Sequence, residues 1–154
     1  MALPPKLTTA AACRVAGLHR DRFNEHVAAD HFGCAPSTVP GRARLFDPDD
    51  MVALWLFREI MDDGMNARDA GRIACSVADA ARNNPGDAAI AYVQHINGRR
   101  SSIPARMVPD ASLWGPGAPD GFDIRKVTFF NIAWTRRLIA VATEEERSII
   151  GEKD

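Results

Sequence analysis

Apolar and polar positions in the first part of the chain follow the period of short helices. Thr8 is a suitable N-cap, and the helix after it is expected to run to about Ala16. Gly17 can end that helix in a left-handed conformation. A second short helix begins two or three residues later, with Phe23 and Val27 four positions apart on its buried face. The pattern therefore predicts two short helices joined by a tight turn.

A break in periodicity separates these helices from the next ones. Residues 31–45 contain two glycines and two prolines, a composition typical of a loop or hairpin. Residues 42–46 can form a short extended piece that places Arg42 and Arg44 on one face.

Two longer helices are predicted next from their start signals. Asp47 is a good N-cap, Pro48 fits the first helical position, and Asp50 follows three residues after the cap. Gly64 is expected to end this helix, and Asn66 to cap another that runs to about residue 83. The apolar positions expected inside the two helices are Met51, Val52, Trp55, Leu56, Ile60, Ala70, Ile73, Cys75, Val77 and Ala80.

The pattern changes to strands after residue 86. Residues 89–96 are apolar, and Asn97-Gly98 is a favourable two-residue hairpin turn. A partner strand within residues 99–108 is confined to a sheet edge, or broken, by Pro104. Glycines and prolines then make residues 109–123 a loop.

A last strand and a last helix complete the predicted elements. Residues 125–130 have strand character, and Asn131 can cap a helix that extends to about Arg147. The core positions expected in this helix are Ile132, Leu138, Ile139 and Val141. The predicted fold class is α+β, with a mostly helical domain at residues 6–84 and a small antiparallel-sheet-plus-helix domain at residues 85–150.

Composition narrows the class of protein. The chain has 154 residues, of which 46% are hydrophobic and 25% charged, as in ordinary soluble globular proteins. No apolar run approaches the roughly 20 residues that span a bilayer, and the N-terminus has no secretory signal pattern. Cysteines at three positions, an odd number, argue against a disulfide framework and for a reducing cytoplasm.

Charge is unevenly distributed, although the whole chain carries only −1. Residues 1–45 hold six basic and three acidic side chains, a net charge of +3. Residues 46–82 carry −4, and the remainder is neutral. A basic N-terminal segment is therefore hidden inside a neutral total, and a local positive field suits a polyanionic partner.

Three short segments of the first half share an order and spacing with a known family. They are residues 8–18 (TTAAACRVAGL), residues 44–51 (RLFDPDDM) and residues 63–66 (DGMN). Together they resemble the first helix and turn, the wing exit with the start of the third helix, and the break before the fourth helix of MerR-like winged helix-turn-helix proteins. The resemblance covers residues 7 to about 80 and implies a DNA-binding fold for that part of the chain.

The resemblance also implies which residues meet DNA. It places the second short helix in the major groove, where arginine can pair with guanine and asparagine with adenine. It places Arg44 at the wing's usual arginine, and the wing would offer Arg42 as well to the phosphate backbone or minor groove. The DNA-binding residues predicted in this way are Thr9, His19, Arg20, Asp21, Arg22, Asn24, His26, Arg42 and Arg44. The arginines could instead form an ordinary solvated face.

The predicted function is sequence-specific regulation of transcription by a cytoplasmic, nucleoid-associated homodimer on double-stranded DNA. RNA polymerase or another DNA-bound protein stays open as a further partner. Two alternatives remain: an excisionase-like architectural protein that bends DNA, and a helix-turn-helix module that binds protein. Asp21 and Glu25 favour the last, because carboxylates oppose phosphate.

The C-terminal part departs from the family pattern. Pro85-Gly86 interrupts the long helix through which such proteins usually dimerise, and no heptad pattern follows. A dimer contact could come from apolar residues of the C-terminal unit, which could equally form that unit's own core. These residues are Ile90, Tyr92, Phe129, Phe130, Trp134 and Leu138.

Other chemistry finds little support in the sequence. His31 and Cys34 have ligand-like spacing, but the Cys-x-x-Cys knuckle typical of structural zinc sites does not occur. A redox sensor built on Cys34 stays open. No phosphate loop or serine nucleophile motif is present, and His95 is expected to border a strand. We therefore expect no cofactor, no metal, no catalytic residues and no enzymatic activity.

Overall fold

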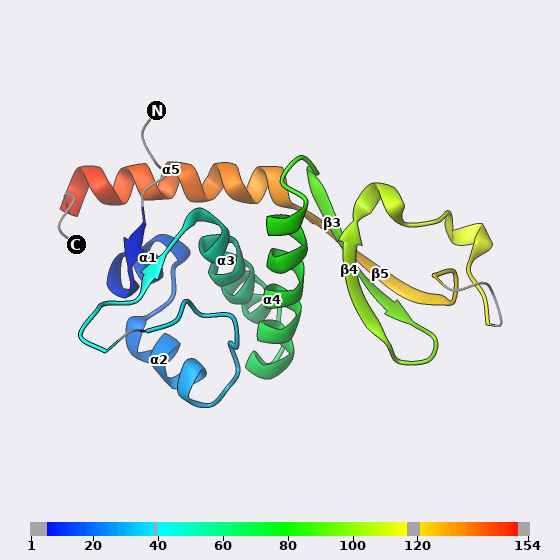
Figure 1. Ribbon diagram of the computed structural model, residues 1–154, viewed down its shortest axis with the longest axis horizontal. Helices are drawn as coiled ribbons and strands as arrows, with labels where there is room; N and C mark the ends of the chain where they lie inside the picture. Colours follow the sequence, from blue (N-terminus) through cyan, green and yellow to red (C-terminus); the bar gives the residue numbers. More distant parts are fainter. Residues whose placement is uncertain (1–5, 39, 117–120, 151–154) are drawn as a thin grey trace.

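The computed structural model describes residues 6–38, 40–116 and 121–150. These residues form five α-helices, two short 3-10 turns and two small antiparallel sheets, so the expected mixture of helix and sheet is confirmed. The helices gather at one end and the three-stranded sheet lies at the other (Figure 1). In chain order the elements are β1 (Leu7–Thr8), α1 (Thr9–Ala16), α2 (Arg20–Ala28), β2 (Leu45–Phe46), α3 (Pro48–Asp62), α4 (Ala67–Asn83), β3 (Ala89–His95), β4 (Arg100–Pro104), η1 (Ala105–Met107), η2 (Ala111–Leu113), β5 (Ile124–Asn131) and α5 (Ile132–Ile150).

The first two helices begin and end where their capping residues predict. The Thr8 hydroxyl accepts a hydrogen bond from the Ala11 amide at 3.3 Å. Gly17 takes a φ of 78°, and its amide donates back to the end of α1. Because only glycine adopts that conformation without strain, α1 stops there. His19 caps α2 by accepting from the Asp21 amide at 3.2 Å.

Side-chain caps also fix the starts of α3 and α4. Asp47 and Asp50 form a reciprocal capping box, with N–H···O distances of 2.7 and 2.9 Å. Asn66 accepts from the Asp69 amide at 2.9 Å. Most apolar positions expected inside these helices are buried, and Trp55 and Cys75 are half-buried.

The segment expected to form the wing differs from its prediction. The extended piece comprises only Leu45 and Phe46, which pair with Thr8 and Leu7 of β1 instead of forming a local hairpin. Arg42 and Arg44 precede the strand in irregular backbone, so they do not share a strand face. The physical reason is a hydrogen bond of 2.6 Å from Arg44 Nη1 to the Pro36 carbonyl, which holds Arg44 against its own loop.

The three-stranded sheet has the order β4-β3-β5 and is antiparallel throughout. Pro104 ends the edge strand β4, as predicted. The turn between β3 and β4 has three residues rather than two, because the His95 amide donates to the Arg99 carbonyl and the Gly98 amide to the His95 carbonyl. Gly98 alone takes a positive φ, 89°, in this turn, which fits a three-residue loop and not the predicted two-residue turn.

One apolar core joins the helices to the inner face of the sheet. Phe23 is fully buried in this core, with ring centroids 5.9 Å from Phe32 and 5.7 Å from Phe46, both edge-on. The final helix α5 packs against α1 and α3 (Figure 1) and buries Ile132 and Ile139. A smaller apolar cluster occupies the other face of the sheet.

Helix α5 begins where the sequence predicts but buries fewer of its apolar residues than expected. The predicted start is confirmed, because Asn131 Oδ1 accepts from the Trp134 amide at 3.0 Å. Val141 is 55% exposed rather than buried, and Leu138 is half-buried. The reason is that α5 lies on the surface and turns only one side toward α1 and α3. None of the described helices combines the length and the apolar character that crossing a membrane requires.

The expectation of unpaired cysteines is wrong for two of the three. Cys34 and Cys75 form a disulfide between the loop after α2 and helix α4, with their Cα atoms 5.7 Å apart. The loop can come this close because Gly71 on α4 leaves room for the His31 backbone. Cys13 is a buried free thiol, and burial raises its pKa to about 11.

Candidate nucleic-acid interface

Helix α2 is polar on its outer side and anchored on its inner side. Its one fully buried residue is Phe23, which packs among other phenylalanines. The exposed side chains of Arg20, Arg22 and Asn24 come from the same nine-residue helix. Arg20 and Asn24 are four positions apart and share one face of α2, whereas Arg22 is two positions from each and points to another side of the helix that the core holds in place.

Acidic side chains share the exposed surface of α2. Asp21 and Glu25 are both exposed. The Arg22 guanidinium lies 4.0 Å from the Glu25 carboxylate, and both side chains are about 70% exposed. Such a pair contributes at most about 1 kcal/mol, so DNA phosphate or a base edge can displace the glutamate.

His26 lies apart from that outer surface. Its ring is half-buried and edge-on to Phe57, with centroids 5.2 Å apart, and its Nδ1 lies 3.3 Å from Nδ1 of His31. Burial, followed by the neighbouring His31, lowers the pKa of His26. A neutral imidazole packed between α2 and α3 supports the helix from behind.

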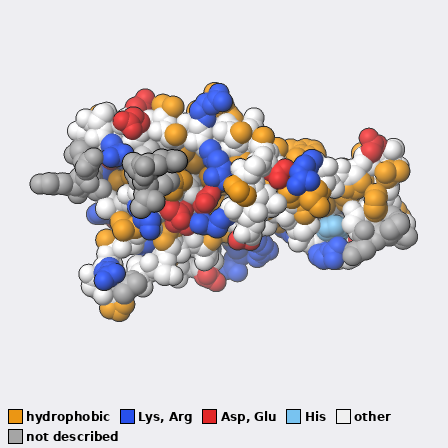
Figure 2. Space-filling view, turned by 45° about the horizontal axis from the view of Figure 1, so that its top comes forward, with side chains coloured by type: hydrophobic (Ala, Val, Ile, Leu, Met, Phe, Trp, Pro, Cys, Tyr) orange, Lys and Arg blue, Asp and Glu red, His pale blue; other side chains and the backbone are white. Residues whose placement is uncertain are grey.

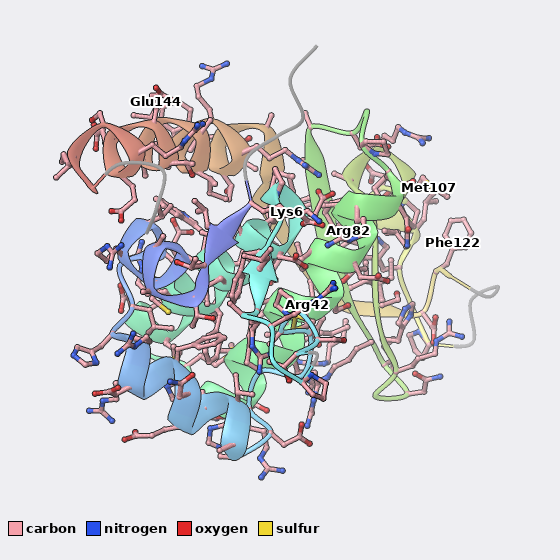
Figure 3. The ribbon with its side chains drawn as sticks, turned by 60° about the vertical axis from the view of Figure 1, so that its left-hand side comes forward. Lys6, Arg42, Arg82, Met107, Phe122 and Glu144 are labelled. Atoms are coloured by element: carbon pink, nitrogen blue, oxygen red, sulfur yellow. A yellow bond between two sulfur atoms is a disulfide. The ribbon has the colours of Figure 1, made fainter. Side chains whose placement is uncertain are left out.

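The other predicted contacts have mixed positions. His19 is exposed at the N-cap of α2, and Thr9 is half-buried in the first turn of α1. Arg42 is exposed in the loop that leads into β2 (Figure 3). Arg44 is half-buried and held by Pro36, so it shapes the loop that presents Arg42.

Basic side chains neutralise the acidic start of α3. Arg82 from α4 lies 3.1 Å from Asp47 and 3.0 Å from Asp50. Arg136 from α5 lies 2.8 Å from Asp49. Burial acts to raise the pKa of Asp47, but the Asp50 amide and the Arg82 guanidinium outweigh it and hold that pKa below its ordinary value. Burial raises the pKa of Asp50. The network was not predicted, because its partners are 32 or more positions apart in sequence.

Two large aromatic side chains are exposed near the junction of β5 and α5. Phe129 is 58% exposed at the end of β5, and Trp134 is 50% exposed at the start of α5. The view that brings the α5 side forward shows hydrophobic side chains between charged ones on this face (Figure 2). Ile90 and Tyr92, by contrast, are buried in the core and Phe130 packs against it, so they are not surface contacts.

Ligands for a metal ion are not gathered in the part of the chain that the structure describes. No group of three or more histidine, cysteine or carboxylate side chains has a suitable arrangement there. Cys34, which the sequence pairs with His31 by spacing, is bonded to Cys75 instead.

Comparison with known proteins adds no family to this description. Neither the protein-family models nor the curated proteins compared with the chain give a match. The assignment of function therefore depends on the geometry of α2 and on the loop before β2.

Proposed function

We propose that the protein is a sequence-specific DNA-binding regulator of transcription that places α2 in the major groove. The observation that carries the proposal is that α2, anchored by Phe23, exposes Arg20 and Asn24 on one face and Arg22 on another side. A helix fits the major groove, and these side-chain types can pair with guanine and adenine edges. The likeness of residues 7–80 to MerR-like winged helix-turn-helix proteins supports the same placement.

The loop before β2 supplies a second contact. Arg42 is exposed there, and the bond from Arg44 to Pro36 braces the loop behind it. An arginine on such a loop suits a phosphate contact, which positions the protein without reading sequence. Arg42 is thus assigned to the DNA backbone and Arg44 to the shape of the loop.

The proposal includes a homodimer. Helix α2 has nine residues and can read only a few base pairs, so useful specificity needs two copies on one site. The exposed Phe129 and Trp134 suit a contact between copies, because aromatic residues are enriched at interfaces. An association with the nucleoid, and a contact with RNA polymerase, would follow from regulation of this kind.

Selection of bound genomic fragments followed by gel-shift titration tests the proposal. Arg20→Ala and Arg22→Ala should each weaken binding to the selected site by about tenfold, since a good base contact contributes about 1–3 kcal/mol. Arg106→Ala is the matched control, because this arginine is exposed and pairs with Asp87 in the C-terminal part. The control should bind like the parent protein.

Salt dependence separates the two kinds of contact. Arg42→Ala should weaken binding on all sequences alike and reduce the salt slope by about one. Unchanged affinity in the Arg20, Arg22 and Arg42 variants would refute the proposed interface.

One observation favours a different function. Asp21 and Glu25 on α2 oppose phosphate, which is expected of a helix-turn-helix that binds protein. Failure of every genomic fragment to bind at low salt would support that reading. Strong DNA bending without any effect on transcription would instead support an excisionase-like role.

A further inference from the structure

A buried histidine at the sheet end of the molecule joins an acid and a serine. His95, the last residue of β3, is 5% exposed. Its Nδ1 lies 3.0 Å from Asp123 Oδ1, and its Nε2 lies 3.3 Å from Ser101 Oγ. The three residues come from β3, from β4 and from the position just before β5, so the folded sheet creates the arrangement.

The hydrogen bonds define a direction for proton transfer. The bond from His95 holds the pKa of Asp123 below its ordinary value, so this carboxylate is ionised at neutral pH. An ionised Asp123 accepts the Nδ1–H of the imidazole, and that tautomer leaves Nε2 as an acceptor. Nε2 can then accept the hydroxyl proton of Ser101, which is the relation between nucleophile, base and orienting acid used in serine hydrolases.

These groups line a pocket on the sheet face that is turned away from the helices. On the inner side of β4, Ser102 bonds Ser76 of α4 at 2.6 Å, so the neighbouring Ser101 points to the outer side. The pocket there has a volume of about 500 Å³, within the range of small-molecule sites. Its lining includes His95 and Ser101 together with Val93, Ile103, Met107, Phe122 and Ile124. Met107 and Phe122 lie at the same end of the molecule, far from Arg42 (Figure 3).

The edge strand also offers a donor for a developing negative charge. The His95 amide bonds the Arg99 carbonyl, and in an antiparallel ladder bonded and non-bonded pairs alternate from that point. Ser101 pairs with Val93 in the next bonded pair. The amide of Ser102 therefore points to the open edge of β4, next to the Ser101 hydroxyl, where it can stabilise an oxyanion.

We propose that Ser101 is the nucleophile of an acyl-transfer site that hydrolyses esters of small apolar carboxylic acids. Ser101 Oγ attacks the ester carbonyl carbon while its proton passes to His95 Nε2. The bond between that carbon and the leaving oxygen breaks, and His95 gives the proton to the departing alcohol. Water then attacks the acyl-serine with His95 as base, which releases the acid and restores Ser101. Asp123 is a positioning residue that holds the imidazole tautomer.

The size and lining of the pocket select the substrate class. Aliphatic and aromatic side chains make up most of the walls, beside the charged Arg99, and suit a short apolar acyl group. This activity is independent of DNA binding by α2 and departs from the expectation that the chain has no catalytic residues. Three polar residues separated by 6 and 28 positions leave no local motif in the sequence.

An alkyl fluorophosphonate, which phosphonylates activated serines, tests the nucleophile directly. Incubation with the 154-residue chain and peptide mass spectrometry should find one modified residue, Ser101, and Ser101→Ala should abolish labelling. His95→Gln should slow labelling by roughly a hundredfold or more, the usual contribution of a general base. Ser112→Ala, which removes an exposed serine outside the pocket, should label at the parent rate.

Hydrolysis of p-nitrophenyl butyrate supplies the second measurement. Asp123→Asn should lower kcat by at least about tenfold with little change in KM, because it disturbs the tautomer and not the pocket. Circular dichroism of each variant checks that it is folded. A folded parent protein that neither labels at Ser101 nor hydrolyses the ester would overturn the proposal and leave His95 as a structural link across the hairpin. Labelling at other serines only would overturn it as well.

Discussion

Replacement of Gly71 by alanine has two opposite effects on the free energy of unfolding, and their magnitudes decide whether the protein becomes more or less stable. Gly71 lies inside α4 and is buried beneath the loop that follows α2. Alanine has the higher helix propensity, which alone would stabilise the helix by about 1 kcal/mol. The added methyl group must also fit against the His31 backbone.

The folded structure has no room for that methyl group. A Cβ atom built on Gly71 overlaps the His31 carbonyl oxygen and lies 2.8 Å from the carbonyl carbon, whereas real Cβ atoms essentially never come closer than 3.0 Å to another heavy atom. The obstacle is backbone, which cannot rotate away as a side chain can. Overpacking of this kind costs typically about 1–3 kcal/mol, and a clash with backbone belongs at the upper end.

The clash therefore exceeds the gain in propensity. We expect Gly71→Ala to lower the free energy of unfolding by about 2 kcal/mol, which corresponds to a decrease in Tm of about 4–8 °C for a chain of this length. Urea unfolding followed by circular dichroism at 222 nm measures the change. Because His31 lies three residues after α2, the same variant should also bind the selected DNA less tightly.

Gly33→Ala is the control in the same loop. A Cβ atom at Gly33 meets nothing within 4 Å, and its φ is not in the left-handed region. Alanine there should leave stability unchanged or raise it by up to about 1 kcal/mol, through a smaller entropy of the unfolded chain. A Gly71→Ala protein as stable as the parent, or more stable, would refute the reasoning.

Three further predictions concern the cysteines and the start of α3. Iodoacetamide should modify no cysteine in the native unreduced protein at pH 8, because Cys34 and Cys75 are bonded and the buried Cys13 thiol has a pKa of about 11. It should modify Cys13 alone after unfolding, and all three cysteines after unfolding with reduction. A modified Cys34 or Cys75 without reduction would contradict the disulfide. Reduction of the Cys34–Cys75 bond should lower the free energy of unfolding by up to about 4 kcal/mol, because a cross-link over a sequence separation of 41 removes that much loop-closure entropy from the unfolded chain. Urea titration with and without dithiothreitol measures the change. Asp47→Asn should make the free energy of unfolding less sensitive to acid. The pKa of Asp47 in the folded protein lies below its ordinary value, so its charge stabilises the fold at neutral pH. That contribution is lost as the pH falls through the folded pKa, and the asparagine variant does not have it to lose. Equal loss of stability between pH 6 and pH 3 in the parent and in Asp47→Asn would count against the bond from Arg82.

Sequence alone could predict those parts of the fold that local interactions determine. Thr8, Gly17, Asp47 and Asn66 act through hydrogen bonds or backbone conformations within four residues, so each predicted a helix end that the structure confirms. The edge position of Pro104 follows from a missing amide and is equally local. Signals of this kind do not depend on the rest of the chain.

Distant contacts account for the expectations that were wrong. The extended piece before Asp47 pairs with Leu7 and Thr8, which lie 37 or more positions earlier, and the bond from Arg44 to Pro36 shortens it. Val141 has an apolar side chain at a position that α5 turns outward, because α1 and α3 cover only its other side. The type of a side chain does not by itself determine such contacts, which are decided only when the helices and strands pack together.

The candidate interface combines both kinds of information. Local pattern was sufficient to place Arg20, Arg22 and Asn24 on one short helix, and the structure keeps them exposed. His26 belongs to the same helix but faces Phe57 and His31, which only the packing of α2 on α3 decides. Asn24 and His26 are two positions apart and therefore on different sides of α2, which separates a side chain proposed to reach DNA from one that supports the helix.

The loop after α2 makes the orientation of that helix depend on α4. Three contacts fix the loop: the close approach of His31 to Gly71, the Cys34–Cys75 bond, and the hydrogen bond from Arg44 to Pro36. Two of them end on α4, so a change in α4 reaches the end of α2, three residues before His31, through a short stretch of backbone. Docking of α2 into a groove needs its side chains placed to within about an ångström, since hydrogen bonds to base edges weaken steeply with misalignment. Affinity for DNA should therefore fall in Gly71→Ala at temperatures where the protein is still fully folded, whereas Gly33→Ala should retain it.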